Sequence, residues 1–476
     1  MTFNSFTFGL FLIIVFGGSR LPISWTMRKW ILLLASYIFY AAWNPIFVIL
    51  LWLSTGIDWW AARLIARSNS RRWRDILLGI SLVSNLGLLA YFKYGTFLLE
   101  NVLGFARLAG LVIDASIPSI VLPVGISFYT FQTLSYTLDV YRGVQKPSPS
   151  MLDFALYVTF FPQLVAGPIV RADEFLPQCE CEHRSGPLEI SWGMILLLLG
   201  LFEKVVVADG LLSPVVEAVY GSTHSSPSLL VSWSGAIAFA GQIFCDFAGY
   251  SHCAIGTAMC LGFALPDNFR FPYAAEGFSD FWHRWHISLS TWLRDYLYIP
   301  LGGSRDGAWR TGRNLMIAMM LGGLWHGAAW TFLIWGGVHG LLLIIERAVR
   351  ASRLAAWELW SKFSGRVIIR IVTLAVICLS WVPFRAKSWE QTVSHWQAMV
   401  GMSKSDGALD MGRDVIAIAW LAFFLLVAGH WMLRDQTLEG LWTRSPQWVQ
   451  VAVMSSMILA LCILPGEDRA FIYFQF

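Results

Sequence analysis

The chain has 476 residues, of which 57% are hydrophobic and only 13% are charged, and its formal net charge is +4. Soluble domains carry about 25% charged residues, so this composition excludes an ordinary soluble domain and is typical of a polytopic membrane protein. The basic residues lie in a few loops and form no extended basic surface, so we expect the lipid bilayer as a partner and no nucleic acid.

Apolar windows recur along the whole chain. Several are shorter than the roughly 20 residues that a simple span needs, so we expect about ten to twelve true spans, with short re-entrant and interfacial helices between them. The sequence therefore predicts an all-α polytopic membrane protein with a single integral domain over residues 1–476. The windows lie at roughly 5–18, 30–43, 45–61, 76–93, 118–138, 151–166, 190–208, 231–263, 314–326, 328–346, 367–384, 414–432 and 449–465.

Loop charges predict the orientation, because cytoplasmic loops are enriched in Lys and Arg. Arginines cluster at 63–74 and at 347–366, which marks both loops as cytoplasmic. The segment 209–229 has no Lys or Arg and should face outward, so the span that follows it places the polar stretch 268–313 on the cytoplasmic side. Its charged residues are Arg270, Arg284, Arg294, Arg305, Arg310 and Arg313 against Glu276, Asp280, Asp295 and Asp306.

Within this stretch, residues 278–298 predict one amphipathic helix with a wide aromatic face, because Trp and other large residues recur at steps of three and four. His286 lies near the edge of that face, and Ser290 follows one turn later. Two interpretations stay open at this point. The helix either lies at the headgroup level with its Trp residues in lipid, or carries a functional histidine.

A second histidine, His326, lies inside an apolar run with no charged residue between Arg313 and Glu346. A titratable group at membrane depth is costly and is a functional-site hypothesis by default. Its ordinary pKa near 6.5 suits a general acid or base; the alternative is a neutral histidine that hydrogen-bonds across helices. Asp246 also lies in a long apolar run, so it needs a partner, and it is a candidate to orient His326 or His252.

Several familiar chemistries are not indicated. Cys179, Cys181 and His183 lack a second ligand pair, so we expect no metal site. The chain shows neither a nucleophile elbow nor a phosphate-binding glycine loop with its lysine. This pattern favours direct transfer to an incoming hydroxyl over a covalent acyl-enzyme.

Five motifs of this sequence resemble the membrane-bound O-acyltransferase family, in the bacterial branch that acts in alginate O-acetylation. They span most of residues 85–345, with residues 1–84 and 350–476 as peripheral helices. The most specific are the long polar motif around His286 and the Trp-His-Gly at His326. The motifs lie at 122–136, 160–169, 246–250, 280–303 and 323–328.

The resemblance implies a ring of tilted helices around a central funnel, with catalytic roles for His326 and His286. It also implies acetyl-CoA as a cytoplasmic donor and no bound cofactor. The acetyl group would cross the bacterial inner membrane to an exported polysaccharide with the help of a periplasmic partner of the SGNH type. The mildly basic 268–313 stretch suits the phosphates of coenzyme A, although positive-inside bias explains it equally well. The motif residues that we expect to bind substrate are Trp325, Trp285, Arg284, Asp246 and Ser290.

Two other functions stay open. One is the transfer of D-alanine or another acyl group to a cell-envelope polymer. The other is a polysaccharide or lipid transporter without chemistry, although polar groups concentrated at two histidine motifs are not typical of a transport path. The sequence does not identify the polymer. Alginate, cellulose and other exopolysaccharides are all candidates, and peptidoglycan is favoured less.

Overall fold

The structure is a computed structural model. It describes residues 2–111, 113, 118, 120–221, 227–353, 357, 360, 362–403, 411–464, 469, 471 and 472. These residues form helices and no strand, which confirms the all-α prediction. The chain divides into two compact units, residues 1–194 with 254–266 and residues 195–253 with 267–476. The family ring and the single-domain organisation stay predictions.

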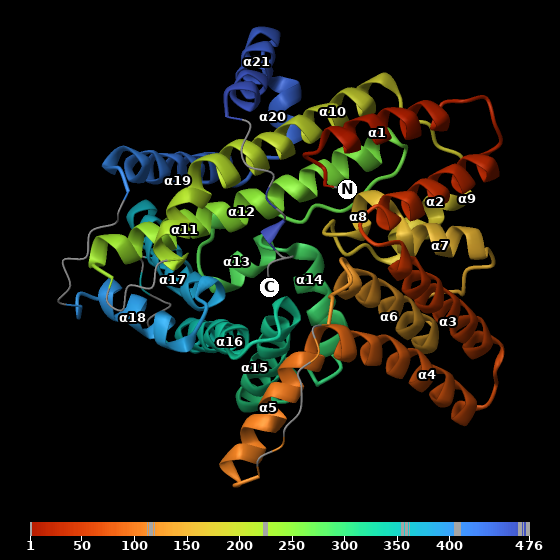
Figure 1. Cartoon of the computed structure of the whole chain (residues 1–476), viewed down its shortest axis with the longest axis horizontal. Helices are drawn as coiled ribbons and strands as arrows, with labels where there is room; N and C mark the ends of the chain where they lie inside the picture. Colours follow the sequence, from red (N-terminus) through yellow and green to blue (C-terminus); the bar gives the residue numbers. More distant parts are fainter. Residues whose placement is uncertain are drawn as a thin grey trace. The chain divides into compact units, whose positions relative to one another are not determined.

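The first unit is organised around α3 (Val48–Arg67), which packs against α4 (Arg71–Leu89) and α6 (Ile126–Arg142) (Figure 1). A buried carboxylate ties the three together. Asp58 on α3 accepts hydrogen bonds from Asn85 Nδ2 on α4 (2.7 Å) and from Thr137 Oγ1 on α6 (2.9 Å). A buried polar network whose members are paired in this way fixes one packing arrangement. The other helices that begin in this unit are α1 (Phe6–Ser19), α2 (Trp25–Ala41), η1 (Pro45–Phe47), η2 (Ala90–Tyr94), α5 (Gly95–Leu108), α7 (Met151–Thr159), α8 (Phe161–Leu164), α9 (Ala172–Glu180) and α10 (Pro187–Leu201).

The second unit carries both motif histidines. Its helices are η3 (Phe202–Leu212), α11 (Ser213–Gly221), α12 (Leu229–Cys260), η4 (Pro272–Ala274), α13 (Phe278–Arg284), α14 (Ile287–Leu293), η5 (Arg294–Tyr298), α15 (Gly307–His326), α16 (Trp330–Arg350), α17 (Phe363–Arg385), α18 (Trp389–Met399), α19 (Arg413–Leu433), α20 (Leu438–Arg444) and α21 (Gln447–Ile463). α12 begins in this unit and ends in residues of the first unit. α10 begins in the first unit and ends in this one.

The tightest helix pair of the second unit is the hairpin of α15 and α16, which lie side by side in Figure 1. Glycines allow the two backbones to touch. A Cβ atom on Gly323 would lie 2.2 Å from the carbonyl oxygen of Phe332, and one on Gly336 would lie 2.3 Å from that of Met319. Small residues at such crossings permit the close approach that stabilises helix pairs in membranes. The hairpin brings His326, at the end of α15, next to Trp335 on α16.

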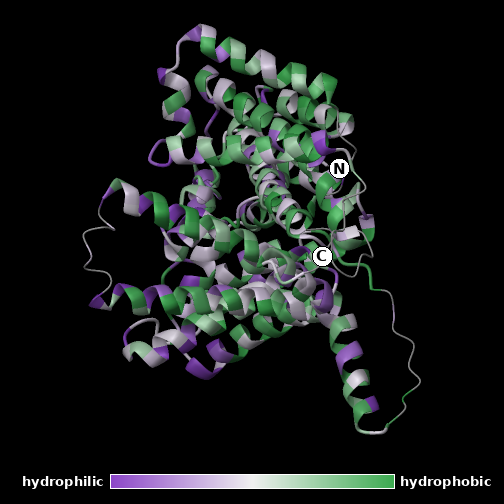
Figure 2. Ribbon diagram, turned by 90° about the vertical axis from the view of Figure 1, so that its left-hand side faces the viewer, coloured by the Kyte–Doolittle hydropathy of each residue, from purple (hydrophilic) through white to green (hydrophobic). Residues whose placement is uncertain are grey.

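Six of the described helical stretches are long and apolar enough to cross a membrane. They are Pro45–Arg67, Arg71–Leu108, Leu229–Cys260, Trp330–Arg350, Phe363–Arg385 and Arg413–Leu433. Figure 2 shows hydrophobic residues along the helices and hydrophilic ones gathered at helix ends and connections. The chain is therefore a multi-pass membrane protein.

Six is fewer than the ten to twelve spans that the hydropathy windows predict. The window at 151–166 shows why. Its helix α7 stops at Phe160, whose ψ of 111° is extended, and the four-residue α8 containing Pro162 follows. A proline has no amide hydrogen and its ring clashes with the carbonyl four residues earlier, so α7 cannot continue through Pro162, whereas the first turn of α8 tolerates it. An apolar window can thus consist of short buried helices instead of one span.

Candidate active site

Residues 278–298 form three short helical pieces instead of the single amphipathic helix that their periodicity predicts. α13 and α14 are separated by Trp285 and His286, and the π-helical η5 follows directly after α14. His286 has φ 43° and ψ 55°, in the left-handed region that residues other than glycine occupy rarely. Strained backbone of this kind concentrates at functional sites. The break in the helix therefore marks His286 as a candidate functional residue.

The chain segment just before α13 holds this break in place. The amide of Arg270 donates to the carbonyl of Arg284, and the amide of Ile287 donates to the carbonyl of Asn268, both at 2.9 Å. The side chain of Asn268 adds a third link, because its Oδ1 lies 3.1 Å from His286 Nδ1. Long-range backbone pairing of this kind has no periodic signature, so Asn268 cannot be recognised as a site residue from the sequence.

The aromatic face of the segment packs inside the second unit. Phe281 and Trp285 are fully buried, with their rings stacked at 5.5 Å, and Trp285 also contacts Trp381 at 5.0 Å. A helix lying at the headgroup level would expose these rings to lipid. That interpretation is therefore wrong for this segment, because Phe281 on α13, Trp285 at the break and Trp292 on α14 are buried in the protein.

His326 lies among aromatic rings at the end of α15 and is 3% exposed. Its ring centroid is 5.1 Å from that of Trp325, 5.2 Å from Trp335 and 5.3 Å from Phe384. The His286 ring lies 6.3 Å from it. The structure thus brings together the two histidines that the sequence predicts to be catalytic, from motifs about forty residues apart.

His286 is fully buried, and burial lowers its pKa to about 3. The ring is therefore neutral at physiological pH. Between the ordinary pKa of 6.5 and about 3, the unfolded chain binds a proton that the folded protein does not, so burial of His286 costs stability as the pH falls through this range.

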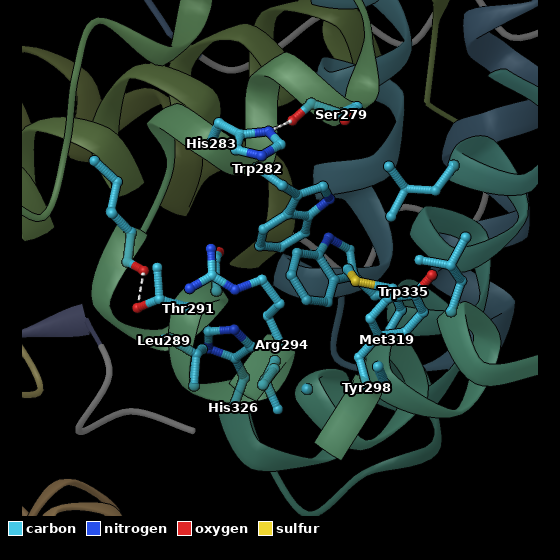
Figure 3. A pocket seen from close by; sticks show the side chains of 17 residues that line it. Ser279, Trp282, His283, Leu289, Thr291, Arg294, Tyr298, Met319, His326 and Trp335 are labelled. Carbon is cyan, nitrogen blue, oxygen red and sulfur yellow. Dashed lines mark hydrogen bonds between the residues drawn. The ribbon is translucent and has the colours of Figure 1, made fainter. Parts of the chain in front are cut away.

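A cavity of about 240 Å³ reaches His326 (Figure 3). Its walls come from α13, α14, η5, α15 and α16. Trp282, Leu289, Met319 and Trp335 contribute apolar surface, and Ser290 contributes a hydroxyl. Ligand pockets for drug-sized molecules are larger, about 300–1,000 Å³. The volume therefore suits a short acyl group on a slender chain better than a long or branched acyl group.

The polarity of the cavity wall changes along its length. His283 and Arg294 line it and are exposed, whereas His326 is almost completely buried. Arg294 is held by the adjacent carboxylate, with its Nε 2.7 Å from Asp295 Oδ1. Among the described residues that line the cavity there is no Asp or Glu. The exposed edge thus presents a guanidinium that is already paired with Asp295, and an anionic group there would share it with this carboxylate, whereas the wall beside His326 suits an uncharged group.

A carboxylate of α16 fixes the start of α13, on which the cavity wall depends. Glu346 Oε2 accepts hydrogen bonds from the amides of Phe278 (2.6 Å) and Ser279 (2.9 Å). Its Oε1 forms an ion pair at 2.5 Å with Arg350, whose side chain is 61% exposed. Helix amides without a partner inside a protein are costly, so Glu346 locks α13 to α16.

We expect Glu346→Ala to lower the free energy of unfolding by about 2 kcal/mol, because two amides lose a charged acceptor. Thermal unfolding of the purified protein, followed by tryptophan fluorescence, measures the change. Arg350→Ala is the matched control, since it removes the exposed ion-pair partner and leaves the amide contacts intact. Equal losses of stability in the two variants would contradict the role of Glu346.

Arg284 and Asp280 belong to a charged clamp on α13. Asp280 accepts hydrogen bonds from Arg284 Nε and from Arg434 Nη2 at the end of α19, both at 2.8 Å. Burial opposes ionisation of Asp280, but hydrogen bonds from the Glu276 amide and the two guanidinium groups outweigh it and lower the pKa of this carboxyl. Arg284 is engaged in this clamp and does not line the cavity.

The structure separates the five predicted substrate-binding residues. Ser290 lines the cavity, but Arg284, Trp285, Trp325 and Asp246 do not. Trp285 packs in the core, and Trp325 packs against both histidines, 5.6 Å from His286 between ring centroids. The break at His286 turns consecutive motif residues in different directions, so membership of one motif does not place them on one wall.

Asp246 pairs with a lysine, not with either histidine suggested by the sequence. Its Oδ1 lies 2.5 Å from Lys204 Nζ, and its Oδ2 accepts a hydrogen bond from the Ile472 amide at 2.8 Å. His252 instead pairs with Glu203, 2.7 Å from its Nδ1. Lys204 lies in the π-helical η3. Sequence patterns do not reveal a π-helical turn, so this partner could not be predicted.

Comparisons with known proteins identify the family of the chain. Residues 142–381 match the model of MBOAT, the membrane-bound O-acyltransferase family. The chain is 37% identical to the probable alginate O-acetylase AlgI of Pseudomonas aeruginosa, over 89% of this chain and 81% of that protein. It is 35% identical to a peptidoglycan O-acetyltransferase of Helicobacter pylori, over 78% of this chain and 73% of that protein.

A more distant relative is a teichoic acid D-alanyltransferase of Bacillus subtilis, 24% identical over 56% of this chain and 69% of that protein. The chain belongs to the membrane-bound O-acyltransferase family, as its motifs predict. It is therefore an O-acyltransferase embedded in a membrane, and family membership favours this enzyme over a transporter without chemistry.

Proposed function

We propose that the protein is an acetyltransferase of the bacterial inner membrane, which takes acetyl groups from cytoplasmic acetyl-CoA for O-acetylation of an exported polysaccharide. The observation that carries the proposal is the buried His326 on the wall of a small cavity whose exposed edge is basic. A periplasmic acetyltransferase of the SGNH type is the proposed partner for the last transfer. Similarity to alginate O-acetylases supports alginate or a related exopolysaccharide as the acceptor.

In the proposed reaction, His326 is the general base. It accepts the proton of the acceptor hydroxyl while the hydroxyl oxygen attacks the thioester carbonyl of acetyl-CoA. The carbon–sulfur bond breaks when the tetrahedral intermediate collapses, and the proton passes to the leaving thiolate. The products are an acetyl ester and free coenzyme A. General acid–base help of this kind contributes about 10²–10⁴-fold to a rate.

The charge of the cavity wall supports acetyl transfer over D-alanyl transfer. A D-alanyl group carries an ammonium, which needs a carboxylate or several oxygen acceptors once water is excluded. The described wall residues include the cation Arg294 and no acidic side chain. The phosphates of coenzyme A fit beside Arg294 and His283, and the uncharged acetyl group fits the apolar interior.

Membrane vesicles supplied with radiolabelled acetyl-CoA test the proposal. We expect label to accumulate on envelope polysaccharide in vesicles from a strain with the gene, and not in vesicles from a deletion strain. The same vesicles with D-alanyl carrier protein as donor provide the comparison. Incorporation from the D-alanyl donor but not from acetyl-CoA would overturn the choice of acyl group and leave the family assignment intact.

A further inference from the structure

The side-chain amide of Asn268 lies beside His286 in an orientation that its neighbours determine. Its Oδ1 is within hydrogen-bond distance of three groups: the Ser288 hydroxyl (2.9 Å), the Ser288 amide (3.3 Å) and His286 Nδ1 (3.1 Å). Its Nδ2 donates to Ser251 Oγ at 3.3 Å. A backbone amide only donates, so the atom that faces Ser288 must be the oxygen.

This orientation has a consequence for the histidine. An oxygen that faces His286 Nδ1 accepts a hydrogen bond, so Nδ1 must carry a proton. A neutral imidazole has one N–H, and Nε2 then holds a lone pair. Nε2 is buried and has no hydrogen-bond partner among the described residues. A buried acceptor without a partner needs an explanation, and a reacting group in a catalytic site provides one.

We propose that Asn268 is a positioning residue that holds His286 in the Nδ1–H tautomer, so that the buried Nε2 is left as a hydrogen-bond acceptor. This inference rests on the proposed function for the role of Nε2, but the tautomer does not depend on it. The His326 ring lies 6.3 Å from the His286 ring between centroids. Phe247 and Trp325 pack edge-on against the His286 ring at 4.6 and 5.6 Å between centroids. The ring thus has an aromatic frame and one polar anchor, Asn268.

The tautomer can be read without any assay of activity. We expect ¹⁵N-histidine NMR of the labelled protein in lipid bilayers to show a His286 signal with a protonated Nδ1 and an unprotonated Nε2. The signal is assigned by its disappearance in His286→Gln. In Asn268→Leu, which has a side chain of similar size, we expect the two tautomers to mix. An Nε2–H tautomer in the unmodified protein would overturn the proposal.

Kinetics of coenzyme A release from acetyl-CoA provide the second readout. We expect Asn268→Leu to lower kcat by about 10–100-fold with little change in KM, as is typical when the partner that orients a functional histidine is lost. Asn268→Asp keeps an oxygen acceptor and should restore the tautomer and most of kcat. Ser288→Ala is the matched control, because the Ser288 amide and His286 still meet Oδ1; we expect less than about a threefold change, since one neutral hydrogen bond is lost.

The outcomes separate the two hypotheses. Absence of acetyl-CoA turnover in the unmodified protein with an Nδ1–H signal at His286 would reject the donor and keep the role of Asn268. Turnover in Asn268→Leu equal to that of the unmodified protein would reject the role of Asn268 and keep the donor.

Discussion

His326→Ala is expected to reduce acetyl transfer by at least about 100-fold, because the proposed reaction loses its general base for the hydroxyl proton. The protein should still insert and accumulate. The ring lies on a cavity wall, so its removal enlarges an existing space instead of exposing a buried charge. Acetyl content of envelope polysaccharide measures the effect in cells, and coenzyme A release measures it with purified protein.

Two further variants make this result specific. His326→Gln keeps a polar side chain of similar length but has no titratable group, so it should be as inactive as the alanine variant. His183→Ala removes a histidine whose side chain is 57% exposed and should leave activity unchanged. Normal acetylation by a well-folded His326→Ala protein would rule out His326 as the base.

Gly336→Ala is expected to destabilise the protein strongly. The added Cβ atom would lie 2.3 Å from the Met319 carbonyl oxygen and 2.9 Å from Met320 Cα, so two helix backbones would have to separate. Overpacking of this kind costs about 1–3 kcal/mol or more. Because α15 carries His326 and α16 carries Trp335, a wider hairpin also deforms the cavity. Protein yield and thermal unfolding in detergent measure the loss.

The neighbouring glycine provides a control of equal chemistry. A Cβ atom on Gly337 would have its nearest neighbour, Met320 Cγ, at 4.0 Å, which is an ordinary contact. Alanine is also a better helix former than glycine, by about 1 kcal/mol. Gly337→Ala should therefore be as stable as the unmodified protein or more stable. Equal behaviour of the two alanine variants would show that the hairpin is not held by backbone contact.

The sequence predicts the class of this protein well, because its strongest signals are local. Runs of apolar residues reveal membrane helices, and His326 in an uncharged run stands out without any structure. The structure confirms the helical class and brings His326 within 6.3 Å of His286. Catalysis by these two histidines remains a prediction that the variants above test.

Features that depend on distant partners could not be predicted. The periodicity of residues 278–298 is that of one helix, yet backbone pairing with Asn268 and Arg270 breaks it. The cap on α13 comes from Glu346, 68 residues along the chain from Phe278. Arg284 and Trp285 belong to the most specific motif but do not line the cavity. A sequence motif shows which residues are consecutive, but it does not show the direction in which each side chain points.

The left-handed backbone at His286 also decides how this residue should be replaced. An alanine there would lose the ring and keep the steric penalty of a Cβ atom at φ 43°. A glycine adopts this conformation freely and would leave a vacant space with the outline of an imidazole. Free imidazole can therefore be added to a His286→Gly variant for chemical complementation, because the folded protein keeps a space of the right shape for the ring.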